Sequence, residues 1–365
     1  MNLKIAVIPW NNAGMQNKIF IIDDPKQNKD NRNNPFFDMK KAFEDNGDVF
    51  QTVDLFEDLR DVDYFCFFEL HWDWLYKIVK LGKADRMIYC NAEPPVFNAM
   101  NCPEGYVFIS KFFPYILTWN DRWVDGKTIF SRNIPYYFVE NFGNVPFEKR
   151  KLLTSISGNK KSDHPDELYS ERERVISFFE KNYPDDFDFY GTSWDKEMHP
   201  NYKGMVANKA QTYHHYRYAV CFENMKNIHG YVTEKILDCF VAGIVPIYAG
   251  AEDIRNYVPE NSFIDYNQFN TLTELAEYLL DIDKDKYEKY LQAAKEFMHS
   301  SGIDKFSGKK YADCIYDVIK MKKEFKVSFF RVGYIRFVDL KIKVTSSIKG
   351  KLIASKQKMK KKVGK

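Results

Sequence analysis

Residues 218–250 constrain the fold more than any other part of this chain, because they predict a complete strand–loop–helix–strand unit. The apolar run 218–222 is typical of a buried strand. After a polar loop, Thr233 can cap a helix whose apolar residues recur at helical spacing. Gly243 can end that helix, and residues 244–248 are typical of the next strand. Such a unit belongs to an open α/β sheet.

Charged and polar side chains gather where the loop of this unit meets the helix. Free N–H groups and a partial positive charge at a helix N-terminus suit phosphate, and Lys235 adds a full charge there. Glu234 is an acceptor for a ribose hydroxyl, and Asn224 offers both a donor and an acceptor. In open α/β sheets, ligands bind at the carboxyl ends of the strands. One interpretation is a nucleotide-diphosphate pocket; the other is a dipole-stabilised Glu234 beside a solvated Lys235, and spacing leaves both open.

The same stretch resembles a known family. The runs Phe-Glu-Asn at 222–224, Tyr-Val-Thr-Glu-Lys at 231–235 and Gly-Ile-Val-Pro-Ile-Tyr-Ala-Gly at 243–250 are similar to the donor-site signature of the family 10 α-1,3/4-fucosyltransferases. The resemblance implies a GDP-fucose site in the C-terminal half of a GT-B-type fold. It implies donor contacts from Glu223, Asn224, Tyr231, Glu234 and Lys235, with Lys235 on phosphate.

An arginine upstream fits the same resemblance. The family has an Arg at the head of a helix, followed by a strand that ends in an aromatic residue and Gly, as in Tyr190-Gly191. Arg172 matches that Arg best, because apolar residues follow it at helical spacing, while Arg174 stays open as an alternative. The resemblance implies that this Arg binds the diphosphate. Without it, an Arg solvated on a helix and paired with a neighbouring Glu explains the pattern equally well.

A glutamate in the N-terminal half is the predicted general base. The family carries Glu-Ser-Pro where this chain has Glu93-Pro94-Pro95, and the resemblance makes Glu93 the catalytic residue. The missing Ser puts local contacts to the acceptor in doubt. From the residues alone, Glu93 is better explained as a carboxylate at a strand end in a Pro-stiffened loop.

The chain of 365 residues, 45% of them hydrophobic, is long enough for two cores. With this length, the resemblance implies an α/β protein with two Rossmann-like domains that face a cleft in the GT-B manner. Residues 1–147 would form an acceptor-binding domain and residues 148–319 a GDP-fucose-binding domain. Residues 320–365 would form a basic amphipathic tail.

The tail differs sharply in charge from the rest of the chain. Residues 320–365 carry 16 Lys or Arg against two acidic residues, a net of +14, and since the whole chain is +3 the remainder carries −11. Apolar residues of the tail fall on one helical face: Val327, Phe330, Tyr334, Phe337 and Val338. Such a segment favours an anionic membrane surface. The alternatives are a solvated basic tail and a nucleic-acid arm, and the acidic body without a nucleic-acid motif speaks against the latter.

Apolar segments, cysteines and Asp-x-Asp runs indicate which cellular location and which cofactors to expect. No segment reaches the eighteen or so apolar residues of a membrane span, the N-terminal apolar run is too short for a signal peptide, and six scattered cysteines predict free thiols. We expect a cytoplasmic protein, peripheral on the inner face of the membrane. Asp-x-Asp occurs at 186–188, 281–283 and 283–285, but in settings that favour chance spacing. We expect no metal site and no required cofactor, with a divalent metal at most a stimulant.

Together these patterns predict an inverting fucosyltransferase. The acceptor would be a hydroxyl of a glycan that contains GlcNAc or galactose, in α-1,3 or α-1,4 linkage, in a lipid-linked precursor of a bacterial surface polysaccharide. Two alternatives remain. One is a transferase of this fold with another nucleotide sugar, and the other is a membrane-associated glycan-binding protein without turnover. No nucleic-acid partner is expected.

Overall fold

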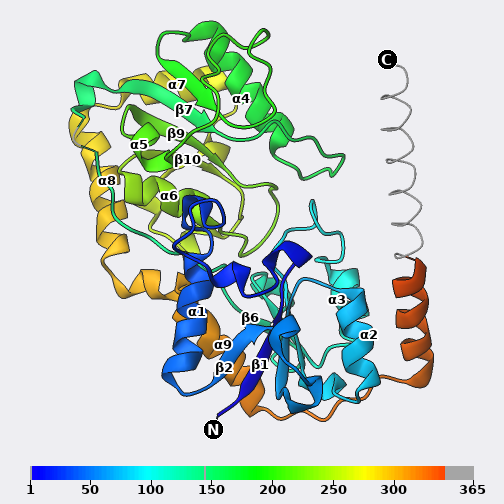
Figure 1. The fold of residues 1–365 in the computed structure, drawn as a ribbon. Helices are drawn as coiled ribbons and strands as arrows, with labels where there is room; N and C mark the ends of the chain where they lie inside the picture. Colours follow the sequence, from blue (N-terminus) through cyan, green and yellow to red (C-terminus); the bar gives the residue numbers. More distant parts are fainter. Residues whose placement is uncertain (1, 144, 342–365) are drawn as a thin grey trace, which may run out of the picture.

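In the computed structural model, which describes residues 2–143 and 145–341, the short apolar segments form two separate parallel sheets. One sheet belongs to each half of the chain, and the two domains lie one above the other in Figure 1. The strands are near-continuous apolar runs, as expected for parallel strands that helices cover on both faces. The predicted α/β architecture with two Rossmann-like domains is confirmed.

The N-terminal sheet is buried between two layers of helices. Its strands, in spatial order, are β2 (Val49–Thr52), β1 (Lys4–Ile8), β3 (Tyr64–Phe68), β4 (Met87–Cys90), β5 (Tyr115–Thr118) and β6 (Ile129–Ser131). Helix α1 (Asn34–Asp45) packs on one face, and α2 (Trp72–Lys80) and α3 (Pro103–Ile109) pack on the other. The order reverses between β1 and β3, which makes that pair the topological switch point.

The C-terminal sheet repeats this plan. Its strands, in spatial order, are β11 (Ile264–Asp265), β10 (Val245–Ala249), β9 (Tyr216–Phe222), β7 (Lys151–Ile156) and β8 (Phe187–Tyr190). One face carries α5 (Lys209–Tyr213), α6 (Glu234–Ala242) and the end of α8 (Lys284–Met298); the other carries α4 (Tyr169–Asn182) and α7 (Leu272–Asp281). The order reverses between β7 and β9.

The strand–loop–helix–strand unit expected from sequence is present as β9, α6 and β10. The Thr233 side chain accepts the backbone N–H of Lys235 and caps α6. Gly243 ends the helix with φ 67° and ψ 46°, a left-handed conformation that costs glycine little. These local signals predicted the unit because each acts within a few residues of chain.

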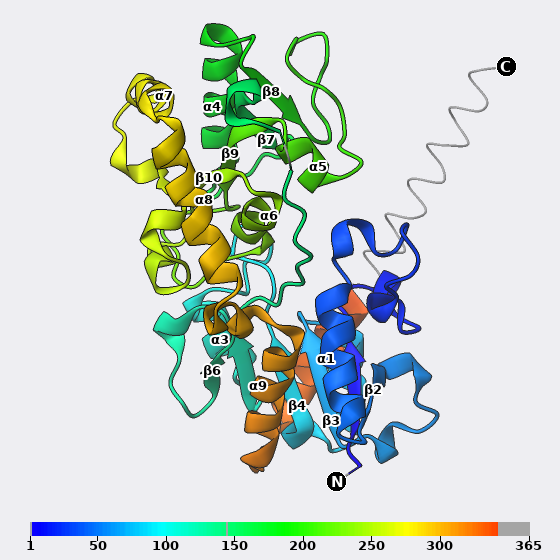
Figure 2. The ribbon, with the colours of Figure 1, turned by 90° about the vertical axis from the view of Figure 1, so that its left-hand side faces the viewer.

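One boundary predicted from sequence needs correction. Helix α9 (Gly308–Lys320) lies within the range assigned to the C-terminal domain, yet it packs beside α1 on the N-terminal sheet. Figure 2 shows the chain leaving the upper domain through α8 and returning to the lower one. Tyr311 and Ile315 are buried there among strands of the N-terminal sheet. An amphipathic pattern predicts that a helix buries a face, but it does not say against which sheet.

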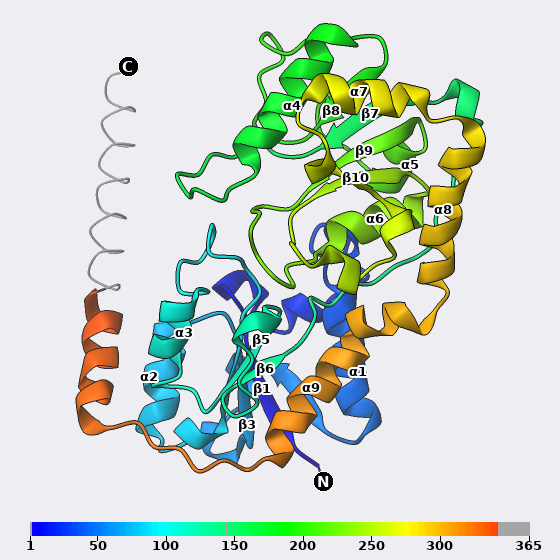
Figure 3. The same ribbon diagram turned by 180° about the vertical axis from the view of Figure 1, so that it is seen from behind.

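The described part of the predicted tail also belongs to this domain. Residues 329–341 are helical and lie beside α2 and α3 in Figures 1 and 3. Ile335 is fully buried, and Val327 and Tyr334 pack against the same core. The prediction that all five apolar residues form one face for a membrane is therefore wrong in part, because Val327 and Tyr334 pack against the protein. Residues 342–365 lie outside the described residues.

The two domains meet closely at one loop. Gly230 has φ +70°, and a Cβ there would lie 2.0 Å from the carbonyl oxygen of Trp119 in the N-terminal domain. The ring of Tyr231 packs on Trp119 at 4.9 Å between centroids. Only glycine allows this approach, so the loop after β9 is held against the opposite domain.

The six cysteines are free, as their spacing predicted. Four are buried, and Cys102 and Cys314 are partly exposed. Within residues 2–143 and 145–341, no helix combines the length and apolar character needed to cross a bilayer.

Candidate active site

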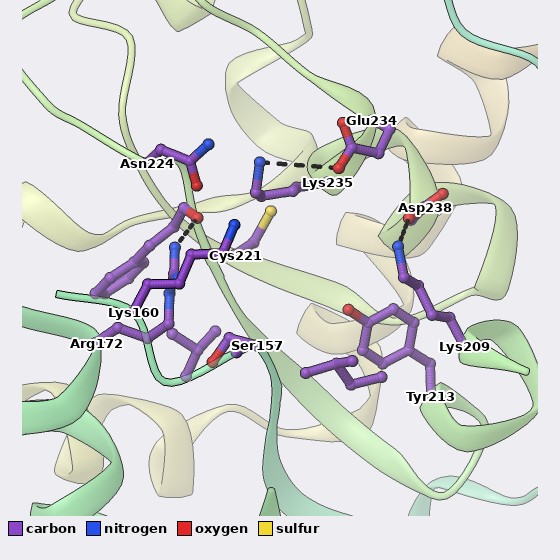
Figure 4. Close-up of a pocket in the computed structure, with 14 residues that line it drawn as sticks. Ser157, Lys160, Arg172, Lys209, Tyr213, Cys221, Asn224, Glu234, Lys235 and Asp238 are labelled. Carbon is purple, nitrogen blue, oxygen red and sulfur yellow. Dashed lines mark hydrogen bonds and ion pairs between the residues drawn. The ribbon is translucent and has the colours of Figure 1, made fainter. Parts of the chain in front are cut away.

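The switch point of the C-terminal sheet opens into a cavity of about 170 Å³ (Figure 4). Loops after β7 and β9 form its walls, together with the start of α6 and one turn of α4, as expected for ligand sites of open α/β sheets. Its polar lining is Ser157, Lys160, Arg172, Lys209, Asn224, Glu234, Lys235 and Asp238. Four cationic side chains face two carboxylates, so the cavity suits an anionic ligand such as a diphosphate.

The N-terminus of α6 contributes two charged side chains, Glu234 and Lys235, to this donor cavity. Burial opposes protonation of Lys235, but Glu223 and Glu234 outweigh it and raise the pKa of the ammonium. Burial likewise opposes ionisation of Glu234, but Lys235 and Lys209 lower its pKa. Both groups are therefore ionised at neutral pH. The predicted donor residues Asn224, Glu234 and Lys235 are brought together as the sequence suggested.

Two predicted donor residues need correction. The Glu223 side chain is fully buried, and its carboxylate accepts from Thr233 N at 2.9 Å and from Lys235 Nζ at 2.9 Å. Tyr231 is 3% exposed and packs on Trp119. Neither lines the cavity. Both support the site from behind, because a motif match gives proximity to a pocket but not the direction of a side chain.

The structure separates the two candidate arginines. Arg172 lines the cavity and donates from Nη2 to the carbonyl oxygens of Phe222 and Glu223, at 2.8 and 3.0 Å. Burial lowers its pKa, although an arginine stays charged. Arg174 points outward, where it pairs with Glu171. Arg172 is thus the arginine available to a ligand in this cavity.

Three charged residues of the cavity were not found from sequence. Lys160 lies in the loop after β7, and burial lowers its pKa. Lys209 Nζ pairs with Asp238 Oδ2 at 3.0 Å, and Tyr136 donates to Asp238 Oδ1 at 2.8 Å. The position of Lys160 after a strand at the switch point was a usable signal. Nothing in the sequence links Lys209 to Asp238, because their contact is tertiary.

Glu93, the predicted base, lies across the cleft in the loop after β4. It is open to the cleft, but the protein around it displaces enough water to raise its pKa, and Glu69 adds to this rise. Within the described part of the chain, no hydrogen bond to its carboxylate is found. The group is therefore free to accept a proton from a bound hydroxyl.

Glu69 holds the Glu93 loop in place and was missed by the sequence argument. It follows β3 with φ +75°, an unfavourable conformation for a residue with a side chain. Its buried carboxylate accepts the backbone N–H groups of Ala92 and Glu93 at 2.5 and 2.9 Å. It also accepts from Asn101 Nδ2 at 3.0 Å. A left-handed glutamate at a switch point is a strained element, and here it positions the loop that carries Glu93.

A second, larger cavity of about 490 Å³ joins the donor cavity. It lies on the N-terminal side and contains Glu93. Both cavities share Lys209, Glu234 and Asp238, so Glu93 and the donor cavity open into one space. This acceptor cavity is mainly apolar in lining, as sites for small ligands often are. The arrangement fits two substrates that meet beside Glu93.

The Asp-x-Asp runs have structural roles. Asp188 pairs with Lys151 and Lys203, and Asp283 caps α8. Contrary to the expectation that no set has metal-ligand geometry, Asp121, His229 and Asp253 place ligand atoms within 4.8 Å of one another at the domain interface. Spacing along the chain could not show this cluster, because its members come from both domains. It is the place in the described residues that could hold a divalent ion.

Comparison with known proteins agrees with this geometry. Residues 147–322 match the family model described as glycosyltransferase family 10 (fucosyltransferase) C-term. Residues 147–322, about half of the chain, are thus similar to the C-terminal domain of the family 10 glycosyltransferases.

Curated relatives include mouse 4-galactosyl-N-acetylglucosaminide 3-alpha-L-fucosyltransferase 9, at 30% identity over 203 residues, which cover 53% of this chain and 51% of that protein. Another is Helicobacter pylori alpha-(1,3)-fucosyltransferase, at 29% identity over 122 residues, which cover 32% of this chain and 23% of that protein. The chain spans about half the length of the first of these relatives, and less of the second.

A solved structure extends the match to the whole fold. The crystal structure of an alpha1,3-fucosyltransferase with GDP superimposes with a TM-score of 0.56 and 14% identity, covering 90% of this chain and 93% of that one. At this identity the likeness shows the fold alone. The two parallel-sheet domains are therefore of the GT-B type.

Because Glu223 fixes Lys235, we expect Glu223→Ala to lower the free energy of unfolding by about 3 kcal/mol, the cost of leaving one member of a buried ion pair unpaired. Glu234→Ala should lower it by less than about 1 kcal/mol, since that carboxylate is half exposed. Urea unfolding of both variants measures the difference. Equal losses would contradict a supporting role for Glu223.

Proposed function

We propose that this protein transfers L-fucose from GDP-β-L-fucose to a hydroxyl group of a glycan, with inversion. The observation that carries the proposal is the cationic cavity of the family 10 domain, which opens beside the free carboxylate of Glu93. The donor cavity holds Lys235 and Arg172 at the N-terminus of α6 and beside the end of β9. These groups suit a nucleoside diphosphate.

The proposed reaction is a single displacement. Glu93 takes the proton of the acceptor hydroxyl, the acceptor oxygen attacks C1 of fucose, and the bond from C1 to the phosphate oxygen breaks. GDP leaves with the bonding electrons, and the β-linked sugar becomes α-linked. Negative charge grows on the diphosphate during this step, where Lys235 and Arg172 stabilise it without reorganisation.

The acceptor proposal rests on the resemblance of the chain and on the names of its relatives. We place the acceptor hydroxyl on a GlcNAc- or galactose-containing glycan, in α-1,3 or α-1,4 linkage, and the biological role in bacterial surface polysaccharide synthesis. No cofactor is required in this proposal. A transferase of another nucleotide sugar would use the same phosphate groups, and a glycan-binding protein without turnover would not need the ionisable Glu93.

We expect GDP-fucose to raise the melting temperature of the protein more than GDP-mannose or UDP-sugars do at equal concentration. A ligand at 100 times its Kd stabilises the folded state by about 2.7 kcal/mol. Lys235→Ala should reduce the shift, because a phosphate contact is lost. Thermal-shift titration measures both. A larger shift with another nucleotide sugar would replace the donor, and no shift with any would contradict a transferase.

Glu93→Gln should lower the transfer rate by about 10²–10⁴-fold, the usual contribution of a general base, while GDP-fucose binding is retained. GDP release in the presence and absence of acceptor measures the rate, and calorimetric titration measures the binding. A variant that transfers fucose at the wild-type rate would remove Glu93 from the mechanism.

The pH profile provides a further check on Glu93. A base works only when deprotonated, and the pKa of Glu93 is raised above the 4.5 of an ordinary glutamate. As the pH falls through that raised pKa, kcat/KM should fall, so the acid limb should lie above pH 4.5. A limb at or below 4.5 would assign it to another group.

We further propose that the protein is cytoplasmic and binds the inner face of the membrane peripherally. On the helix formed by residues 329–341, Phe330 and Phe337 are 88% and 64% exposed on the side opposite the buried Ile335. The basic charge of residues 320–365 would attract anionic lipid, at about 1 kcal/mol per residue near the surface. An apolar face flanked by cations is typical of interfacial helices.

The double variant Phe330→Ser, Phe337→Ser should weaken binding to vesicles of anionic phosphatidylserine by about 10-fold or more, because burying each Phe stabilises the bound state by about 1.5–3 kcal/mol. The matched control changes two equally exposed residues of the other domain, Met198→Ser and Met205→Ser. Cosedimentation measures the binding. Equal effects of both double variants, or equal binding to neutral vesicles, would contradict the proposal.

A further inference from the structure

A buried arginine without a counter-ion lines the acceptor cavity. Arg132, just after β6, is 3% exposed, and Nη1 donates to the carbonyl oxygen of Asn133 at 3.1 Å. Its Nε is buried without a hydrogen-bond partner. Among the residues that the structure describes, no carboxylate lies within 4.0 Å of the guanidinium. Its main neighbour is the ring of Tyr311, 4.6 Å from Cζ.

Such a group is costly unless something balances it. Burying an unpaired cation destabilises a fold, and a cation–π contact offsets only part of that cost. Arg150, another buried arginine of the fold, shows the usual solution. Its guanidinium donates to the carbonyl oxygens of Val145 and Gly243 and to the Tyr287 hydroxyl. Among the described residues Arg132 has one such partner, the carbonyl oxygen of Asn133, and has a cavity beside it.

A row of aromatic rings leads through this cavity toward Arg132. Trp10 is 41% exposed and contacts Phe36 at 5.5 Å between centroids. Phe36 contacts Phe68 at 5.5 Å, and Phe68 contacts Tyr311 at 6.1 Å. All four rings line the cavity. Apolar rings offer flat faces to sugar rings but no charge. Of the cations that line this cavity, Lys29 and Arg32 are exposed and Lys209 pairs with Asp238, so Arg132 is the buried cation that can select for charge.

We propose that the acceptor of this enzyme carries an anionic group, a carboxylate or a phosphate, which the guanidinium of Arg132 binds inside the acceptor cavity. A planar guanidinium binds such oxygens through paired hydrogen bonds. The inference rests on the proposed function for the identity of the cavity as the acceptor site. It adds a specificity residue that no donor contact requires, because Arg132 does not line the donor cavity.

The binding test uses the full chain loaded with GDP and three small probes: methyl β-glucuronide, methyl 6-phospho-β-glucoside and the neutral methyl β-glucoside. The wild type should bind at least one anionic probe about 10-fold or more tighter than the neutral one, since a hydrogen bond to a charged group contributes about 1.5–3 kcal/mol. Which anionic probe binds tighter distinguishes a carboxylate from a phosphate. In Arg132→Met the preference should vanish, and in Arg132→Lys part of it should remain.

The melting temperatures of two variants distinguish a ligand-binding role of Arg132 from a structural role. Arg132→Met should keep the GDP affinity and should not lower the melting temperature, whereas Arg150→Met, which removes three hydrogen bonds, should lower it. A loss in Arg132→Met as large as in Arg150→Met would overturn the proposal. So would a wild type without anion preference, or a preference that survives in Arg132→Met. None of these readouts depends on fucose transfer, so a failed fucose assay would remove the proposed function and leave this inference standing.

Discussion

The buried carboxylate of Glu223 is the interaction on which the rest of the site depends. It directly follows β9 and binds Thr233 and Lys235, so it joins the end of a central strand to the start of α6. The loop between them must then turn back on itself, which brings Gly230 against Trp119 of the other domain. One satisfied charge thus supports both the start of α6, which lines the cavity, and a contact between the domains.

The two domains share one sheet topology. Each parallel sheet reverses its strand order once, and the loops at that reversal diverge and leave room for a ligand. In the C-terminal domain these loops carry cations, and in the N-terminal domain they carry Trp10 and the Glu69 that holds Glu93. Because the two openings face each other, they form together a site that neither domain contains alone.

Charges that the fold keeps buried mark where the chemistry lies. Glu69 is fully supplied with donors, and this makes it a support for a catalytic loop. Arg132 has a buried N–H group without an acceptor, and the carboxylate of Glu93 accepts no hydrogen bond in the described part of the chain. This difference in hydrogen bonding distinguishes Glu69, which holds the Glu93 loop in place, from Arg132 and Glu93, which keep unused hydrogen-bonding capacity.

The amino-acid sequence determined the β9–α6–β10 unit, because caps, glycine turns and hydrophobic periodicity act within a few residues. It also showed which family the loop after β9 resembles. Only the tertiary structure decided that Glu223 and Tyr231 face inward, that α9 returns to the first domain, and that Lys209 meets Asp238. The physical reason is that side-chain direction and helix docking depend on packing between distant segments, whose free energy no local pattern records.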